Sequence, residues 1–258
     1  MNFESSSDKS VAVENNLSKK SLINDLLVSK GYIKFPQFFS KDQITDIIKF
    51  VTIEKKRFFL IEDTISVNTS IEVSREHGLG SPNNVGNNEK QPRLFQHLHL
   101  KLGLEFIKEI GDYINQYFKL NGTVVNMLLF IKHPDPSSVN TSSSPNNEGH
   151  HTITQPHQDG AHFGRSDNYI TFWIPLSNVN TENSCLHYLN DSHKGGILPH
   201  EFDRVELSLV YDNVPLDKFT PVEMNVGDMI CHHPYTLHYS NINKTNEVRY
   251  AIGCIIRL

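Results

Sequence analysis

Two short segments of this chain carry side chains suited to holding a transition metal. The first reads Pro156-His157-Gln158-Asp159-Gly160, and the second contains His238. Because His157 and Asp159 stand two positions apart, an extended strand would direct both side chains to one face. Together with His238 they would form a set of two histidines and one carboxylate, which leaves metal positions open and is typical of non-haem Fe(II) oxygenases. The alternative for His157 and Asp159 is a turn in which they bond their own backbone.

Arg249 is the second informative residue, because it interrupts an otherwise apolar predicted strand shortly after His238. An arginine in such a strand is costly to bury unless an anion pairs with it. Oxygenases that use 2-oxoglutarate need a fixed cation for the distal carboxylate of this cosubstrate, and a guanidinium can hold a carboxylate through two parallel hydrogen bonds. The alternative for Arg249 is an ordinary salt bridge to a buried acid.

His232 and His233 compete with His238 for the role of the third ligand. His238 is favoured because it stands two residues before Ser240 and eleven before Arg249, and a hydroxyl near Arg249 suits carboxylate binding. The other histidines weighed as ligands are interpreted as loop, wall or structural residues. These are His150, His151, His162, His187 and His193.

The first part of the chain is expected to be helical. Apolar residues at helical spacing over 22–27 end at Gly31, a C-cap residue. Ser40 and Gln43 form a capping-box pattern that opens a second helix, with Ile44, Ile47, Ile48 and Val51 on its inner side. A third helix is predicted over 104–118. Two long polar stretches, 66–92 and 134–155, are predicted as loops that cover the mouth of the site.

From Thr123 onward the pattern changes to strands. They are predicted at 123–133, 169–175, 185–189, 206–211, 220–224, 228–232, 236–240 and 248–257. Helices followed by many short strands predict a mainly β fold with flanking helices, a double-stranded β-helix of the cupin-like jelly-roll type. Residues 1–16 are predicted to form a disordered tail, and 17–258 a single domain.

Composition narrows the classes of partner. The formal net charge of -5 and the pI near 6.3 argue against a nucleic acid or an anionic membrane as the main partner. The start of the sequence lacks the features of a secretory signal, and the longest apolar stretch, Met127–Ile131, is too short to span a bilayer. Three cysteines without metal spacing are predicted to be reduced thiols. These features predict a cytoplasmic protein without a nucleic-acid or membrane partner, and they carry no signal for its oligomeric state. The expectation of a small-molecule substrate comes instead from the oxygenase chemistry of the candidate site.

Several motifs in a fixed order make the sequence resemble the phytanoyl-CoA dioxygenase family of Fe(II)/2-oxoglutarate oxygenases. The resemblance runs from Gly31 to Ile256. Its densest segments are Pro156-His157-Gln158-Asp159, Phe172-Trp173-Ile174-Pro175-Leu176, Glu182-Asn183-Ser184-Cys185-Leu186, Ser192-His193-Lys194-Gly195-Gly196 and His238 to Arg249.

The resemblance implies that Fe(II), 2-oxoglutarate and O2 are used to hydroxylate an unactivated C–H bond, with release of succinate and CO2. It implies that His157, Asp159 and His238 are the iron ligands. Arg249 and Ser240 match positions that hold the distal carboxylate of 2-oxoglutarate. In addition, Trp173 matches a residue lining the cosubstrate pocket, and Arg93 matches a basic residue near it. Halogenating relatives carry a small residue where Asp159 stands, so the carboxylate favours hydroxylation.

Two departures from the family pattern concern turns. The family has Asn-Gly-Cys-Leu and Pro-Gly-Ser-His where this chain places Ser184 and Asp191 at the glycine positions. Because glycine suits a positive φ, the turn geometry is expected to differ there. Three alternatives stay open: a prolyl-hydroxylase-like oxygenase, which typically uses lysine in place of Arg249, a cupin-type metal enzyme, and a non-catalytic binding protein on the same scaffold.

Overall fold

The computed structural model describes residues 25–26, 28–52, 97–99, 104–135, 153–203, 206–209 and 214–258. The predicted tail over 1–16, the loop over 66–92, Arg93 and most of 134–155 lie outside these residues. The division into a tail and a single domain over 17–258 therefore stays a prediction.

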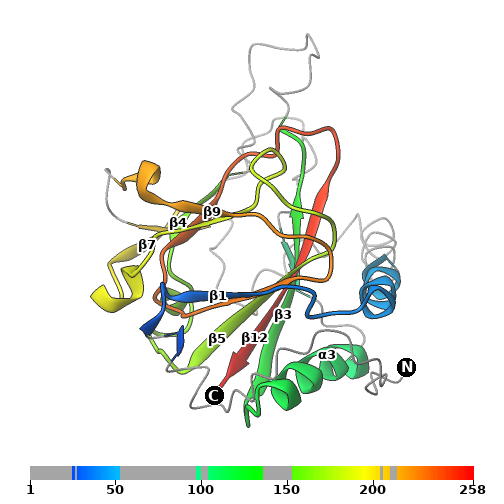
Figure 1. Ribbon diagram of the computed structural model, residues 1–258. Helices are drawn as coiled ribbons and strands as arrows, with labels where there is room; N and C mark the ends of the chain where they lie inside the picture. The colour runs from blue at the N-terminus through cyan, green and yellow to red at the C-terminus, as the bar shows by residue number, and fades with distance from the viewer. Residues whose placement is uncertain are drawn as a thin grey trace, which may run out of the picture.

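Two antiparallel sheets form the body of the fold (Figure 1). The larger sheet has six strands in the order β1-β10-β5-β12-β3-β2. Their bounds are β1 Tyr32–Phe35, β2 His97–His99, β3 Thr123–Lys132, β5 Tyr169–Pro175, β10 Met229–His232 and β12 Arg249–Arg257. The smaller sheet has the order β4-β11-β6-β9. Its strands are β4 Thr154–His157, β6 Leu186–Tyr188, β9 Thr220–Val222 and β11 His238–Ser240.

The remaining elements lie around these sheets. Strands β7 His200–Asp203 and β8 Glu206–Leu209 form a separate two-stranded ribbon. Short 3-10 helices η1 Asp159–Ala161, η2 Ser192–Gly195 and η3 Leu216–Lys218 connect strands. Helix α3, Leu104–Tyr117, and the helical residues 41–52 lie beside the larger sheet (Figure 1). The predicted jelly roll with flanking helices is confirmed.

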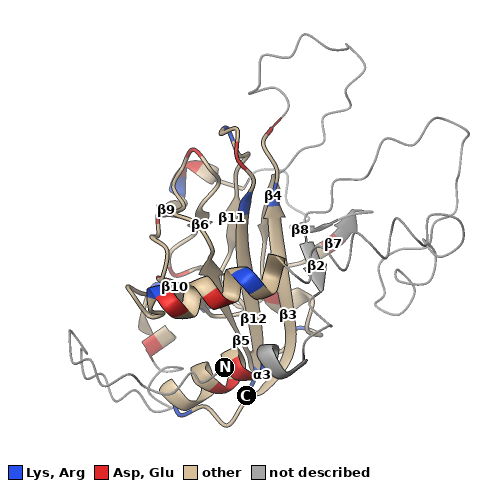
Figure 2. Ribbon diagram, turned by 90° about the vertical axis from the view of Figure 1, so that its right-hand side faces the viewer, with Lys and Arg blue, Asp and Glu red and all other residues tan. Residues whose placement is uncertain are grey.

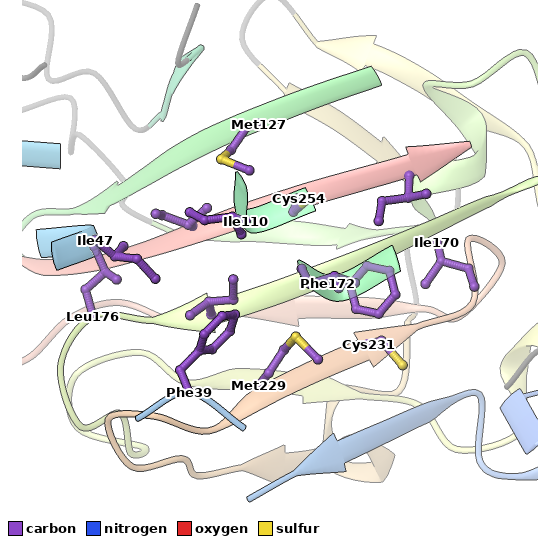
Figure 3. Packing of buried hydrophobic residues seen from close by; sticks show 14 of the residues in the cluster. Phe39, Ile47, Ile110, Met127, Ile170, Phe172, Leu176, Met229, Cys231 and Cys254 are labelled. Carbon is purple, nitrogen blue, oxygen red and sulfur yellow. The ribbon is translucent and has the colours of Figure 1, made fainter. Parts of the chain in front are cut away.

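Alternation along the strands of the larger sheet separates two layers of side chains. In β5, Phe172 and Ile174 pack in the core beneath the helices, whereas Trp173 packs in a second cluster with residues of the smaller sheet. Strand β10 divides in the same way, since Cys231 joins the first cluster and Ile230 the second. Figure 3 shows the first cluster, in which Phe172 and Cys231 lie on the side of the larger sheet that also holds Ile47 and Ile110 of the helices. The opposite face of the larger sheet therefore looks toward the smaller sheet.

Local signals in the helical part are borne out in detail. The Ser40 amide donates to Gln43 Oε1 at 2.8 Å, and the Gln43 amide donates to Ser40 Oγ at 3.2 Å, which is a reciprocal capping box. Gly31 has a φ of 92°, as its C-cap position predicts. One side chain differs: Ile48, expected on the inner side of the helix, is 38% exposed.

The predicted strands are confirmed with small changes at their ends, but four strands, β1, β2, β4 and β7, were not among them. Strand β4 begins at Thr154, inside the stretch predicted as a loop, and β7 begins at His200. Both have polar sequences, Thr-Gln-Pro-His and His-Glu-Phe-Asp, without the β-branched alternation that marks a strand. Pairing with β11 and β8 therefore decides their conformation.

The distribution of charged residues and the state of the cysteines can be compared with what the composition predicts. Figure 2, turned to face the helices, shows acidic and basic residues of the described part interspersed along them. Within the part of the chain that the structure describes, no helix is long and apolar enough to cross a membrane. The three cysteines are buried and unpaired, and burial raises the pKa of each thiol.

Asp228 ties the turn before β10 to the chain that follows β1. Its Oδ1 accepts a hydrogen bond from the Gln37 amide at 3.0 Å, and its Oδ2 accepts one from the Asn225 amide at 2.9 Å. Oδ2 also forms an ion pair with Lys34 Nζ at 3.0 Å. Burial alone would raise the pKa of Asp228, but these donors outweigh burial and lower it. The carboxylate therefore stabilises the folded chain.

We expect Asp228→Asn to lower the free energy of unfolding by about 1–3 kcal/mol at neutral pH, because one charged acceptor of a buried cluster is lost. Since the folded pKa lies below the ordinary value of 3.8, the carboxylate's contribution is complete above that pH. It is lost as the pH falls through the folded pKa. Urea denaturation at neutral and acid pH should show the gap to the original protein closing in acid.

Asp217→Asn is the matched control, because Asp217 is exposed at η3. A gap for Asp228→Asn that stays constant down to strongly acid pH would contradict the assigned role.

Candidate metal and cosubstrate site

His157 and His238 face each other across two paired strands. They are Cα partners in the antiparallel pairing of β4 with β11, and their ring centroids lie 4.3 Å apart. Directly opposed residues of an antiparallel pair lie on the same face of the sheet. The pairing therefore brings the two predicted histidine ligands together from distant parts of the sequence.

Asp159 joins these histidines from a 3-10 helix and not from a strand, which corrects the expectation of one extended strand. Residue 158 still has extended backbone angles, φ -123° and ψ 123°, so His157 and Asp159 remain on the same side. Helix η1 then turns the chain away, and the Gly160 amide donates to the Pro234 carbonyl at 2.8 Å. A Cβ at Gly160 would lie 2.8 Å from the ring of Tyr235, so this approach requires glycine.

Gln158 fixes the backbone between the two ligands from the other side. Its side chain is fully buried and donates to the carbonyls of Gly196, at 2.9 Å, and Tyr235, at 2.6 Å. Its Oε1 accepts the Leu198 amide at 2.8 Å. Both ends of the amide are thus satisfied by backbone groups, which holds the segment rigid.

Backbone carbonyls set the tautomer of both histidines. His157 Nδ1 lies 2.7 Å from the Gln155 carbonyl, and His238 Nδ1 lies 3.0 Å from the Thr236 carbonyl. A carbonyl only accepts, so Nδ1 carries the proton in each ring and Nε2 keeps its lone pair. Burial lowers the pKa of His238 well below its ordinary value, and the neighbouring His157 lowers it further, so the ring is neutral.

The two oxygens of Asp159 have different surroundings. Oδ1 lies 3.5 Å from His157 Nε2 and 3.6 Å from His238 Nε2. Oδ2 accepts the Thr171 hydroxyl at 2.6 Å and lies 2.9 Å from His232 Nε2. Burial alone would raise the pKa of Asp159, but the surrounding histidines outweigh burial and hold it well below the ordinary range. The residue is therefore a carboxylate with one oxygen directed toward the histidines.

These three side chains fit a metal ion. Nε2 of His157, Nε2 of His238 and an oxygen of Asp159 are donor atoms of the kinds that non-haem iron takes. In the described part of the chain, His157, Asp159 and His238 form the one group whose donor atoms all lie within 4.8 Å of one another. The predicted residues are thus brought together with the lone pairs and the charge that a divalent cation requires.

Arg249 is buried, and none of the described acidic residues pairs with it. It is 4% exposed, its Nη2 donates to the Ser184 carbonyl at 2.9 Å, and its buried Nε has no hydrogen-bond partner. Among the described residues no carboxylate lies within ion-pair distance of it, so the alternative of an ordinary salt bridge is not observed there. Burial lowers the pKa of Arg249 to about 10, which leaves it charged at neutral pH. An unpaired buried guanidinium fits the carboxylate of a ligand.

The neighbours of Arg249 complete a polar end of the inter-sheet space. The guanidinium lies 5.3 Å from the centroid of the Trp173 ring, a cation–π contact. Lys132 is the Cα partner of Arg249 across β3 and β12, and its Nζ donates to Thr154 Oγ1 at 3.1 Å. Thr154 is in turn the Cα partner of Ser240. Trp173 and Ser240 therefore belong to the same region as Arg249, while their contact with a cosubstrate stays a prediction.

Sequence reasoning missed several residues of this region. Lys132 carried no signal for burial, yet it is 4% exposed, because the register of β3 against β12 places it opposite Arg249. Thr171 and Tyr188 carried no signal in the sequence. His232 was weighed as a ligand, and the structure places it against the outer oxygen of Asp159.

The other histidines agree with a structural role where they are described. His187 stacks on Tyr239, with ring centroids 4.7 Å apart, and His193 packs against His233 at 5.4 Å. Arg165 is exposed and Lys194 forms an exposed ion pair, as expected of surface charges.

The two positions where the family has glycine adopt a conformation that suits glycine. Ser184 has a φ of 74° and Asp191 a φ of 62°, both in the left-handed region. A turn geometry different from that of the family stays a prediction. The Ser184 hydroxyl donates to the Asn241 carbonyl, and the Ser184 carbonyl accepts Arg249. A strained residue thus helps to hold the buried guanidinium.

We expect Ser184→Ala to unfold about 1 kcal/mol more easily than Ser184→Gly. Both variants lose the hydroxyl bond, worth about 1 kcal/mol, but only glycine removes the cost of a left-handed residue, about 1–2 kcal/mol. Ser184→Gly should therefore lie close to the original protein in urea denaturation. A glycine variant less stable than the alanine variant would contradict this account.

Comparison with known proteins identifies the family. The profile of the family described as Phytanoyl-CoA dioxygenase (PhyH) matches residues 27–251. This chain therefore belongs to the phytanoyl-CoA dioxygenase family, which confirms the resemblance seen in the sequence.

Individual relatives match over part of their length. The chain is 33% identical over 121 residues to the probable phytanoyl-CoA dioxygenase of Caenorhabditis elegans, covering 43% of this chain and 39% of that protein. It is 27% identical over 154 residues to the human peroxisomal phytanoyl-CoA dioxygenase, covering 57% and 43%. The matched part is thus less than half the length of these relatives.

Solved structures share the fold. The epimerase SnoN, in complex with Fe3+, alpha ketoglutarate and nogalamycin RO, superposes with a TM-score of 0.57 at 14% identity, covering 92% of this chain and 84% of SnoN. EvdO2 from Micromonospora carbonacea var. aurantiaca, complexed with 2-oxoglutarate, gives a TM-score of 0.55 at 16% identity, covering 96% and 91%. At these identities the likeness establishes the fold alone.

Proposed function

We propose that this chain is an Fe(II)- and 2-oxoglutarate-dependent dioxygenase in which His157, Asp159 and His238 hold the iron. Arg249, with Ser240 and Trp173 beside it, binds the distal carboxylate of 2-oxoglutarate. One observation carries the proposal. Arg249 is buried without an acidic partner among the described residues, and it lies on the sheet face that looks toward three convergent metal donors. Membership of the phytanoyl-CoA dioxygenase family supports it.

Held by these residues, iron and 2-oxoglutarate would supply oxygen activation, with one atom of O2 going to succinate as CO2 is released and the other to a C–H bond of the substrate. The chain contributes neutral imidazoles with free Nε2 lone pairs, one carboxylate that balances metal charge, and a cation for the cosubstrate. The low exposure of His157, His238 and Arg249 keeps bulk water away from these groups.

The substrate is proposed to be a small molecule that is hydroxylated at an unactivated carbon. Asp159 supports hydroxylation, since its carboxylate occupies the position that halogenating relatives leave to a halide. The relatives named for phytanoyl-CoA, and SnoN with its bound nogalamycin RO, support a small molecule over a macromolecule. A cytoplasmic location belongs to the same proposal and rests on the sequence.

We expect Arg249→Gln to weaken 2-oxoglutarate binding by about 10- to 100-fold, because charge-assisted hydrogen bonds to a buried cation are lost. Calorimetric titration of the Mn(II)-loaded protein with 2-oxoglutarate measures this directly. Succinate release in the presence of Fe(II) and O2 should fall in parallel.

Arg257→Gln is the matched control, because Arg257 ends the same strand and is exposed. It should bind 2-oxoglutarate like the original protein. Equal affinity of Arg249→Gln and Arg257→Gln would remove Arg249 from the cosubstrate site and favour the cupin-type or non-catalytic alternative.

A further inference from the structure

His232 is a third histidine at the proposed metal site, and it stands outside the ligand set. It ends β10, is 1% exposed and lies on the strand face opposite to that of Cys231. Its ring centroid is 4.5 Å from that of His238. Its Nε2 nevertheless points to Asp159 Oδ2, the oxygen that faces away from His157 and His238.

The hydrogen bonds around His232 run in one direction. Asp159 is a carboxylate and only accepts, so the proton of the 2.9 Å contact belongs to His232 Nε2. Tyr188 Oη lies 3.0 Å from His232 Nδ1. Tyr188 is completely buried and its pKa is raised well above the ordinary value by burial, so its hydroxyl keeps its proton and donates to Nδ1. Tyr188 thus donates to His232, and His232 donates to Oδ2 of Asp159.

Two packing features hold this chain in place. The Tyr188 ring stacks on Tyr32, with centroids 4.3 Å apart, and Tyr32 is the Cα partner of His232 across β1 and β10. Thr171 adds a second donor to Oδ2 at 2.6 Å, and it is likewise the Cα partner of His232, across β5. Strands on both sides of β10 therefore determine where His232 can point.

We infer that His232, oriented by Tyr188, is a positioning residue that holds Asp159 as a one-oxygen metal ligand. The inference rests on the proposed iron site. A carboxylate can bind a metal through one oxygen or both, and the second oxygen would take a position that the cosubstrate or O2 needs. With Oδ2 engaged by His232 and Thr171, only Oδ1 is directed to the metal. Outer partners of this kind orient the ligand and tune metal affinity.

The experiment is a titration of the metal-free full chain with Co(II), followed by its visible absorption spectrum. We expect His232→Phe to weaken Co(II) binding by about 10- to 100-fold and to change the shape of the absorption bands, because Asp159 is freed to bind through both oxygens. His232→Gln, whose amide can still donate toward Oδ2, should restore the original spectrum and most of the affinity. Tyr188→Phe should shift both measurements in the same direction by a smaller amount.

His187→Gln is the matched control, because His187 lies on β6 next to Tyr188 in the sequence and stacks on Tyr239, away from the metal donors. It should leave the titration unchanged. If His232→Phe fails to fold, Tyr188→Phe and Thr171→Val test the inference in its place. Tyr188→Phe removes a hydroxyl, and Thr171→Val replaces one with a methyl group of similar size.

Two results would overturn the inference by itself, and a third would overturn the proposed function on which it rests. In the first, His232→Phe leaves the affinity and the spectrum unchanged, which would show that Asp159 needs no outer partner. Where His232→Phe does not fold, the same result in both Tyr188→Phe and Thr171→Val would show this. A loss in His232→Gln as severe as in His157→Ala would make His232 a ligand. Absence of Co(II) binding in the original protein would instead remove the iron site itself, which is the failure of the proposed function.

Discussion

The pairing of β4 with β11 is the constraint on which the site depends. It places His157 directly opposite His238, and no local feature of either segment could do so. Both strands are short, so the register must be held from outside. Gln158 locks one end through three backbone groups, and β6 pairs with the other side of β11. A slip of one residue would turn one histidine out of the site and remove the metal centre.

Burial of charge is the second organising feature. The inter-sheet space holds Asp159, Arg249 and Lys132, three ionisable groups that a purely structural core would exclude. Asp159 is satisfied by donors on one oxygen and leaves the other directed at the histidines. Arg249 is held by a carbonyl and an aromatic face, neither of which neutralises it. The fold thus maintains groups whose full compensation must come from a metal ion and an anionic ligand.

The sequence predicted which side chains come together better than it predicted their surroundings, and the reason is physical. Residue type and spacing singled out His157, Asp159 and His238, because a metal demands particular donors, and the structure brings these three residues together. Their role as iron ligands, and that of Arg249 toward a dicarboxylate, stay predictions. The capping box at Ser40 was readable because it is made within one turn. By contrast, the burial of Lys132 follows from its register against β12, and register depends on residues far away in the chain.

Strand parity explains the other differences. His232 and His233 are adjacent and chemically alike, yet β10 directs only His232 to Asp159, while His233 packs on His193. The polar sequence of β4 gives no strand signal, since its conformation comes from pairing. Ser184 and Asp191 adopt the left-handed conformation that glycine favours. The hydroxyl bond of Ser184 to the Asn241 carbonyl and the ion pair of Asp191 with Lys194 help to offset the strain.

The three donors and Arg249 are proposed to bind iron and 2-oxoglutarate together. Anaerobic addition of Fe(II) and then 2-oxoglutarate to the metal-free protein, followed by visible absorption, tests this binding. We expect a metal-to-ligand charge-transfer band that needs both additions and is lost in His238→Ala. If iron binds but 2-oxoglutarate produces no such band, the proposed cosubstrate site is wrong.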